Sequence, residues 1–154
     1  MSTQLIEYLE LGAVDSSRLM ALLNSPAIRT HLVQHELFRP ETITEWVASK
    51  QAMDAEPGCR VRAVVCDNEL AGWCGIQFED GYYEIAIVID QAFWGVGVSV
   101  FRDIMTWASA LGHREIYMHL RHTRPEYRFL NKMARSVVRT RLLGEAFTRY
   151  QFTV

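Results

Sequence analysis

The residues best suited to chemistry lie between Ile85 and Gly112, in the segment IAIVIDQAFWGVGVSVFRDIMTWASALG. An apolar run ends there in a turn that contains Gly95, Val96 and Gly97, and an amphipathic stretch follows the turn. A strand–turn–helix with glycines in the turn leaves consecutive backbone N–H groups unpaired at the start of the helix, where they favour a phosphate or pyrophosphate. The segment therefore predicts a site for a phosphate-bearing cofactor.

The cysteines point to structural thiols, and no His or Cys spacing predicts a metal site. Cys59, Cys66 and Cys74 are odd in number, lack the C-x-x-C spacing of zinc sites and lie in apolar, strand-like stretches. A catalytic cysteine is the alternative interpretation. Reduced thiols, an N-terminus unlike a signal peptide and the lack of an apolar run of roughly 20 residues predict a cytoplasmic protein without a membrane span.

The composition fits one folded domain with an uneven charge distribution. The chain has 154 residues, is 49% hydrophobic and carries a net charge of −2, which is enough apolar material for a proper core. From residue 121 onward, eight Lys or Arg face two Asp or Glu. A basic C-terminal third is compatible with a polyanionic cofactor or a nucleic acid, and equally with a solvated helix face and charged edge strands.

The elements that must position the glycine turn are a mixture of strands and helices. Helical patterns begin at Asp15, within residues 42–45 (a capping box, TITE), after the glycine turn, and at Thr123. Asp67-Asn68 and Asp80-Gly81 predict tight hairpin turns. Strand-like runs occur at residues 5–11, 60–66, 70–78, 82–89, 115–120, 137–143 and 147–154. We expect a single α/β (α+β) domain over residues 1–154.

This element order, with the glycine turn after the fourth strand, resembles the GNAT superfamily of acyl-CoA-dependent N-acyltransferases. The resemblance covers nearly the whole chain and is strongest over residues 82–133. It implies a mixed, mostly antiparallel central sheet of about seven strands, flanked by about four helices. It also implies that acetyl-CoA is the co-substrate, with its pantetheine arm lying like an extra strand in a splayed gap beside residues 115–120.

The pyrophosphate signature of GNAT proteins is Arg or Gln, two residues, Gly, one residue, then Gly or Ala. The best register here is residues 94–99, in which Trp94 replaces the Arg or Gln and Ser99 replaces the final small residue. The Trp-Gly pair is similar to the branch that acetylates the N-termini of ribosomal proteins. The cofactor-binding residues implied by the resemblance are Ile87, Val88, Ile89, Trp94, Gly95, Val96, Gly97, Val98, Ser99 and Thr123.

Acyl transfer to an amine needs a base for the ammonium and an acid for the leaving thiolate. Glu84, a carboxylate in the apolar run YYEIAIVID, is the candidate base, although strand parity places it opposite Ile87 unless a bulge turns it inward. Its alternative is an outward-facing surface residue. Tyr127 is the candidate acid because Leu130 occupies the slot where GNAT proteins often place a Tyr; its alternative is a packed aromatic. His119 is a further candidate for the same cleft, or a satisfied core or rim residue.

The favoured function is an acetyl-CoA-dependent N-acetyltransferase that moves an acetyl group directly to a primary amine in a ternary complex. The acceptor would be a protein N-terminus, a peptide or a small amine, and the sequence does not identify it. A non-enzymatic module that keeps the fold, similar to internal virion proteins of tailed phages, is one alternative. A toxin-type acetyltransferase acting on aminoacyl-tRNA is another, supported by the basic C-terminal third. A homodimer is one open choice for the oligomeric state.

Overall fold

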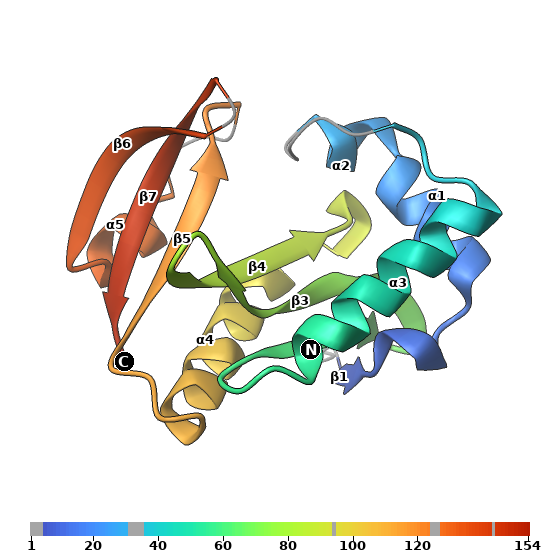
Figure 1. Ribbon diagram of the computed structural model, residues 1–154, viewed down its shortest axis with the longest axis horizontal. Helices are drawn as coiled ribbons and strands as arrows, with labels where there is room; N and C mark the ends of the chain where they lie inside the picture. The colour runs from blue at the N-terminus through green and yellow to red at the C-terminus, as the bar shows by residue number, and fades with distance from the viewer. Residues whose placement is uncertain (1–4, 31–35, 94, 124–126, 143) are drawn as a thin grey trace.

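The centre of the molecule is one seven-stranded sheet (Figure 1). The computed structural model describes residues 5–30, 36–93, 95–123, 127–142 and 144–154. The strand order is β1-β2-β3-β4-β5-β7-β6, and β4 with β5 is the only parallel pair of the described sheet. The strands are β1 (Ile6–Leu9), β2 (Arg60–Cys66), β3 (Glu69–Glu79), β4 (Tyr82–Ile89), β5 (Glu115–Arg121), β6 (Ser136–Leu142) and β7 (Glu145–Thr153).

Helices cover both faces of the sheet, as Figure 1 shows. The first three, α1 (Ser16–Asn24), α2 (Pro26–Arg29) and α3 (Pro40–Asp54), lie on one face. On the other face lie α4 (Val96–Ala110) and α5 (Arg128–Met133), and short 3-10 turns occur at Leu11–Ala13 and Gln91–Phe93. The predicted α/β architecture with a mixed, mostly antiparallel sheet is confirmed. The count of α-helices in the described chain exceeds the expected four by one, because Pro26 starts the single-turn α2.

Two tight turns connect β2, β3 and β4 as predicted. Asp67 and Asn68 have φ values of 49° and 67°, and Asp80 and Gly81 have values of 51° and 84°. Positive φ at both central residues of a two-residue loop matches the right-handed twist of a hairpin. The β3–β4 register runs unbroken from the pair Gly72 and Ile89 to the pair Glu79 and Tyr82. No bulge therefore interrupts β4 against β3.

Each face of the sheet has its own apolar cluster. The amphipathic helix α4 buries Phe101, Ile104 and Ala108 against the sheet, together with Tyr150 and Phe152 of β7. Burial of one face of α4 agrees with the amphipathic stretch expected after the glycine turn. The second cluster joins α1 and α3 to the opposite face, through residues that include Leu19, Leu23, Ile43, Val61 and Trp73.

The sheet splits between β4 and β5. The two strands share one register pair, Glu84 with Tyr117. Beyond that pair β4 continues to Ile89 and β5 to Arg121 without further pairing between them. The predicted gap beside β5 is therefore present, and its two edges carry backbone groups that the other strand does not satisfy.

Two helices begin elsewhere than predicted. The third helix starts at Pro40 rather than at Thr42, because proline fits the first helical position and the Thr42 hydroxyl accepts from the Arg39 N–H at the third position (2.8 Å). The predicted helix start at Thr123 is also wrong. Tyr127 is extended, with φ −99° and ψ 121°, and α5 begins at Arg128. Residues 124–126 of that predicted start lie outside the described chain.

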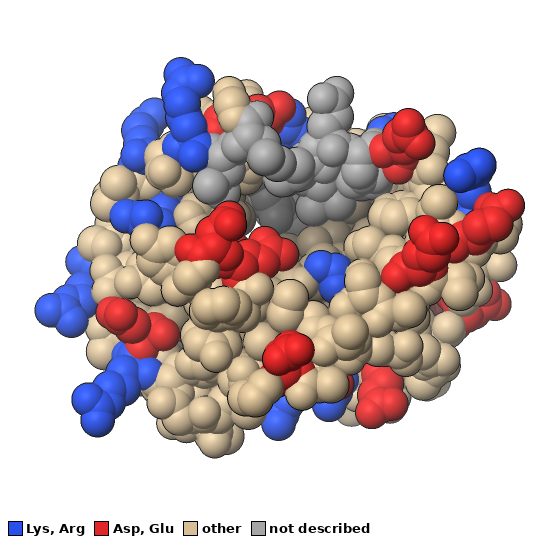
Figure 2. Space-filling view, viewed as in Figure 1, with Lys and Arg blue, Asp and Glu red and all other residues tan. Residues whose placement is uncertain are grey.

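Charge is distributed unevenly over the surface, as Figure 2 shows from the same side as Figure 1. Lys and Arg gather at the edge formed by β6 and β7, while Asp and Glu lie mostly toward the α1–α3 side. The exposed basic residues of α5, β6 and the link between them are Arg128, Lys132, Arg135, Arg139 and Arg141. The charge asymmetry of the sequence is thus also a spatial asymmetry.

Candidate functional site

The glycine turn forms the N-terminus of α4. Gly95 is the N-cap with φ 101°, in the left-handed region, and an added Cβ at either Gly95 or Gly97 would meet nothing within 4 Å. Val96 is buried and anchors the first turn of the helix to the core. A long helix whose first turn borders open space is suited to an anion. Trp94, the residue in place of the expected Arg or Gln, lies outside the described residues.

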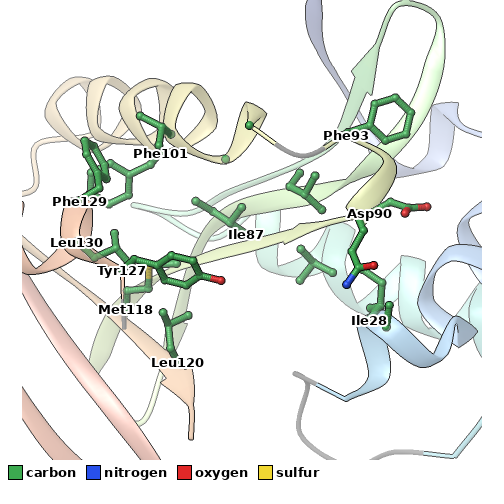
Figure 3. A pocket seen from close by; sticks show the side chains of 17 residues that line it. Ile28, Ile87, Asp90, Phe93, Phe101, Met118, Leu120, Tyr127, Phe129 and Leu130 are labelled. Atoms are coloured by element: carbon green, nitrogen blue, oxygen red, sulfur yellow. The ribbon is translucent and has the colours of Figure 1, made fainter. Parts of the chain in front are cut away.

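A cavity of about 470 Å³ extends from this helix N-terminus into the gap between β4 and β5 (Figure 3). Most of its walls are apolar, and Asp90, Gln91 and Tyr127 are the polar side chains of the described lining. It is lined by Ala27, Ile28, Ile87, Val88, Ile89, Asp90, Gln91, Phe93, Gly95, Gly97, Val98, Phe101, Met118, Leu120, Tyr127, Phe129 and Leu130. The cavity therefore has an anion-binding end and an apolar end, which suits a long ligand with a charged head.

The cavity includes most, but not all, of the described residues predicted to bind the cofactor. Ile87, Val88 and Ile89 line it from β4, and Gly95, Gly97 and Val98 line it from α4. Val96 is turned into the core, while Ser99 is exposed outside the lining. The Thr123 hydroxyl donates to the Thr30 carbonyl (3.2 Å) and does not line the cavity.

Glu84 lies on the sheet face opposite Ile85 and Ile87. Because β4 has no bulge, the parity of the strand is kept, and Glu84 does not line the cavity. Its Oε1 lies 2.7 Å from Nδ1 of His119 on β5, and the two side chains are 18% and 8% exposed. Sequence analysis named both residues but did not pair them, since pairing depends on the β4–β5 register.

Tyr127 projects its ring into the cavity, beside Met118 and Leu120 (Figure 3). It precedes α5 instead of lying on it, which gives its side chain a direction that a helical position would not. Leu130, in the slot of the expected Tyr, is 7% exposed and contributes an apolar wall. Tyr127 is thus the aromatic hydroxyl of the described cavity lining.

Polar contacts connect α2 to the far side of the cavity. The carbonyl of Thr30, at the end of α2, accepts from the Arg121 guanidinium and from Thr123, each at 3.2 Å. Arg121 also forms a two-point ion pair with Glu145 at the start of β7, with N–O distances of 2.5 and 2.7 Å. These contacts fix α2, which contributes Ala27 and Ile28 to the cavity, relative to β5 and β7.

Several walls of the cavity were missed at the sequence level. Met118 and Leu120 share one face of β5, and strand alternation gives a signal that could have found them. Ile28 and Phe129 come from α2 and α5, short helices whose placement depends on tertiary packing. Nothing in the local sequence indicates that these two residues meet the glycine turn.

The cysteines are buried and unpaired, as expected of structural thiols. Burial raises the pKa of the thiols of Cys59, Cys66 and Cys74, which disfavours the reactive thiolate. Among the described residues, no cluster of His, Cys, Asp and Glu could hold a metal ion. Within that same part of the chain, every helix is too short or too polar to cross a membrane.

The fold is similar to that of solved acetyltransferases. A Bordetella pertussis protein assigned to the GNAT acetyltransferase family superposes with a TM-score of 0.77 at 13% identity, covering 99% of this chain and 100% of that one. A GNAT acetyltransferase from Streptococcus pneumoniae gives 0.69 at 15% identity, with 99% of each chain covered. RimL, a ribosomal L7/L12 alpha-N-protein acetyltransferase in complex with coenzyme A, gives 0.71 at 18% identity, covering 99% of this chain and 96% of that one.

Comparison with protein-family models and with curated protein sequences finds no match. At this level of identity the superpositions establish the fold, and the chain has the GNAT fold. The architecture expected from the family resemblance is therefore confirmed. The split sheet and the glycine turn stand in the order that the resemblance implied.

Proposed function

We propose that the chain is an acetyl-CoA-dependent N-acetyltransferase that transfers the acetyl group directly to a primary amine in a ternary complex. The observation that carries the proposal is the cavity that begins at the glycine-bearing N-terminus of α4 and ends in the gap between β4 and β5. Its shape and chemistry suit a ligand with a pyrophosphate at one end and a thin, extended arm at the other. That RimL, a protein of the same fold, binds coenzyme A supports this choice of ligand.

The residues around the cavity suggest how such a ligand would be held. The open space beside Gly95 and Gly97 leaves room for a pyrophosphate against the N–H groups of residues 95–99. The unsatisfied edge of β4 at Ile87–Ile89 would pair with the amides of the pantetheine arm. Asp90 is the one carboxylate in the described lining, and its Oδ1 is occupied by the Ala92 N–H (3.1 Å).

The proposed chemistry uses the two faces of the split sheet. Glu84, on the α1–α3 face, accepts a proton from the acceptor ammonium, directly or through water. The neutral nitrogen then attacks the thioester carbonyl in the gap; a C–N bond forms and the C–S bond breaks. Tyr127, on the cavity side, donates its phenolic proton to the leaving thiolate, and the second proton that the nitrogen loses as the amide forms returns through water to the Tyr127 oxygen. Glu84 and Tyr127 are thus the proposed catalytic residues, and no covalent enzyme intermediate is needed.

The proposed acceptor is a primary amine of a protein N-terminus, a peptide or a small molecule. The reaction requires it to approach from the α1–α3 face, where Glu84 lies. Three buried, unpaired thiols favour a reducing compartment, and we propose the cytoplasm.

The direct test is acetyl transfer with the purified chain. Acetyl-CoA would be mixed with a panel of free amines, including N-terminal peptides, polyamines and free amino acids, and thiol release would be followed together with mass analysis of the acceptor. We expect at least one amine to gain an acetyl group, at a rate that requires the protein. Acetyl-CoA that binds without any acceptor being modified would instead favour a non-enzymatic module. The observation that supports this second candidate is Leu130, an apolar residue in the slot where a catalytic hydroxyl is usual.

A further inference from the structure

The contact between Glu84 and His119 bridges the place where the sheet splits. Glu84 is the last residue of β4 to pair with β5, opposite Tyr117, and His119 lies two residues further along β5. Glu84 lies on the same face of the sheet as its register partner Tyr117. His119 lies on that face too, because residues 117 and 119 alternate with the inward-facing Ile116 and Met118. The 2.7 Å separation of Oε1 from Nδ1 therefore joins the two strands just beyond their one register pair.

The contact restricts how the Glu84 carboxylate can point. A proton on Nδ1 of His119 is required, since a bare ring nitrogen would place its lone pair against a carboxylate oxygen. Oε1 is thereby restrained by a close polar contact whose angle falls outside hydrogen-bond geometry, and among the described residues none hydrogen-bonds the other oxygen. A glutamate side chain otherwise has several rotamers that would carry the carboxylate away from the gap.

The surrounding side chains do not replace this contact. Gln77, the partner of Glu84 on β3, is buried, and its amide oxygen accepts from the Lys50 ammonium. Tyr117, the partner on β5, packs its ring against Tyr82, with centroids 4.7 Å apart. Among the described residues, His119 is thus the neighbour that brings a ring nitrogen within 2.7 Å of the Glu84 carboxylate.

We infer that His119 is a positioning residue for the proposed acetyl transfer, holding Oε1 of Glu84 so that Oε2 faces the acceptor amine. This inference rests on the proposed function. In the step it serves, one ammonium proton moves to Oε2, the nitrogen attacks the carbonyl, and the thiolate that leaves takes its proton from Tyr127. The second proton of the nitrogen then passes through water to the Tyr127 oxygen. His119 itself gains and loses no proton.

Three substitutions at position 119 separate positioning from other roles. His119→Ala removes the donor, while His119→Asn keeps an N–H at the place of Nδ1 and His119→Gln moves an equivalent N–H to the place of Nε2. We expect kcat to fall about 10- to 100-fold in the Ala and Gln variants, part of the 10²–10⁴ that a general base contributes. The Asn variant should recover most of that loss, and the affinity for acetyl-CoA should stay unchanged in all three.

The outcomes are distinct. Equal, low kcat in all three variants, or wild-type kcat in the Ala variant, overturns the inference while leaving the proposed function in place. In a Glu84→Gln background, His119→Ala should add no further loss, whereas an additive loss also overturns it. Melting temperatures of the variants, with and without acetyl-CoA, identify any that fail to fold. If the Ala or Gln variant does not fold, the kcat of the Asn variant decides whether the inference stands. A wild-type chain that acetylates no amine of the panel overturns the proposed function and this inference together.

Discussion

Glu84 is an acidic residue on a strand whose neighbours are apolar, and its position suggests a strong and specific effect on catalysis. Glu84→Gln keeps the shape of the side chain but removes its ability to take a proton. We expect kcat to fall by about 10²–10⁴, the usual contribution of a general base, with the dissociation constant for acetyl-CoA unchanged because Glu84 does not line the cavity. Steady-state kinetics and calorimetric titration measure the two quantities.

Glu69→Gln is the matched control for that substitution. Glu69 is an exposed carboxylate at the start of β3 and lies outside the cavity lining. Its substitution should leave kcat unaltered. Unchanged turnover in Glu84→Gln as well would remove Glu84 from the mechanism.

Tyr127 is the residue whose hydroxyl should matter for the leaving group. Tyr127→Phe deletes a single oxygen from a ring that projects into the cavity. We expect kcat to fall by roughly tenfold or more, since an unassisted thiolate leaves less readily, with little change in affinity for acetyl-CoA. Tyr83→Phe is the control, because its hydroxyl donates to the Pro57 carbonyl outside the cavity (3.3 Å). Equal kcat values in the two variants would contradict the role of Tyr127.

At the residue scale, the sequence predicted which residues are candidates for the site better than it predicted the contacts between them. Strand parity correctly placed Glu84 opposite Ile87, and the bulge that would have turned it inward is absent from the described strand pairing. The contact with His119 depends on a register between parallel strands that are joined by a helix, and no local pattern encodes that register. Tyr127 was named as a candidate, but its direction follows from an extended backbone that the helix prediction did not anticipate.

At the scale of elements, the turn before α4 is where backbone conformation and binding coincide. Gly95→Ala forces a side chain into φ 101°, a strained region that costs about 1–3 kcal/mol, and displaces the N–H groups of the turn. We expect weaker binding of acetyl-CoA together with lower stability. Gly81→Ala, in the β3–β4 hairpin, has a similar φ of 84° and similarly open surroundings.

The hairpin variant separates strain from binding. Both alanine variants should lose comparable stability in denaturant unfolding, but only the Gly95 variant should lose affinity in calorimetric titration with acetyl-CoA. Equal affinities in the two variants would mean that the turn before α4 does not hold the pyrophosphate.

Elements that carry their own boundary signals are the ones that the sequence placed correctly. β2 and β3 end at two-residue turns whose residues favour positive φ, and α1 begins after Asp15, whose side chain accepts from the Ser17 N–H (2.8 Å). In contrast, α2 and α5 have four and six residues and too few internal hydrogen bonds to be stable alone. Their positions, and hence the part of the cavity wall formed by Ala27, Ile28, Phe129 and Leu130, are set by tertiary packing.

At the scale of the whole molecule, the split in the sheet makes ligand binding and stability interdependent. Strands β1–β4 and strands β5–β7 are joined in the sheet by the single pair Glu84 and Tyr117, with α4 packed against their common face. The cavity touches both halves, through Ile87–Ile89 on one side and Met118 and Leu120 on the other. A ligand in the gap would therefore add contacts between halves that the native sheet leaves largely unpaired.

Acetyl-CoA should accordingly raise the melting temperature of the chain. At a concentration about 100 times the dissociation constant, binding to the folded state adds about 2.7 kcal/mol, which for a chain of this size corresponds to an increase of about 5–10 °C. Pantetheine, which can fill the gap but lacks the pyrophosphate, should give a smaller increase at the same concentration, because it makes no contact with the turn at Gly95. An unchanged melting temperature with millimolar acetyl-CoA would contradict the proposed cofactor. Equal increases from the two ligands would instead assign all of the binding energy to the gap and none to the N-terminus of α4.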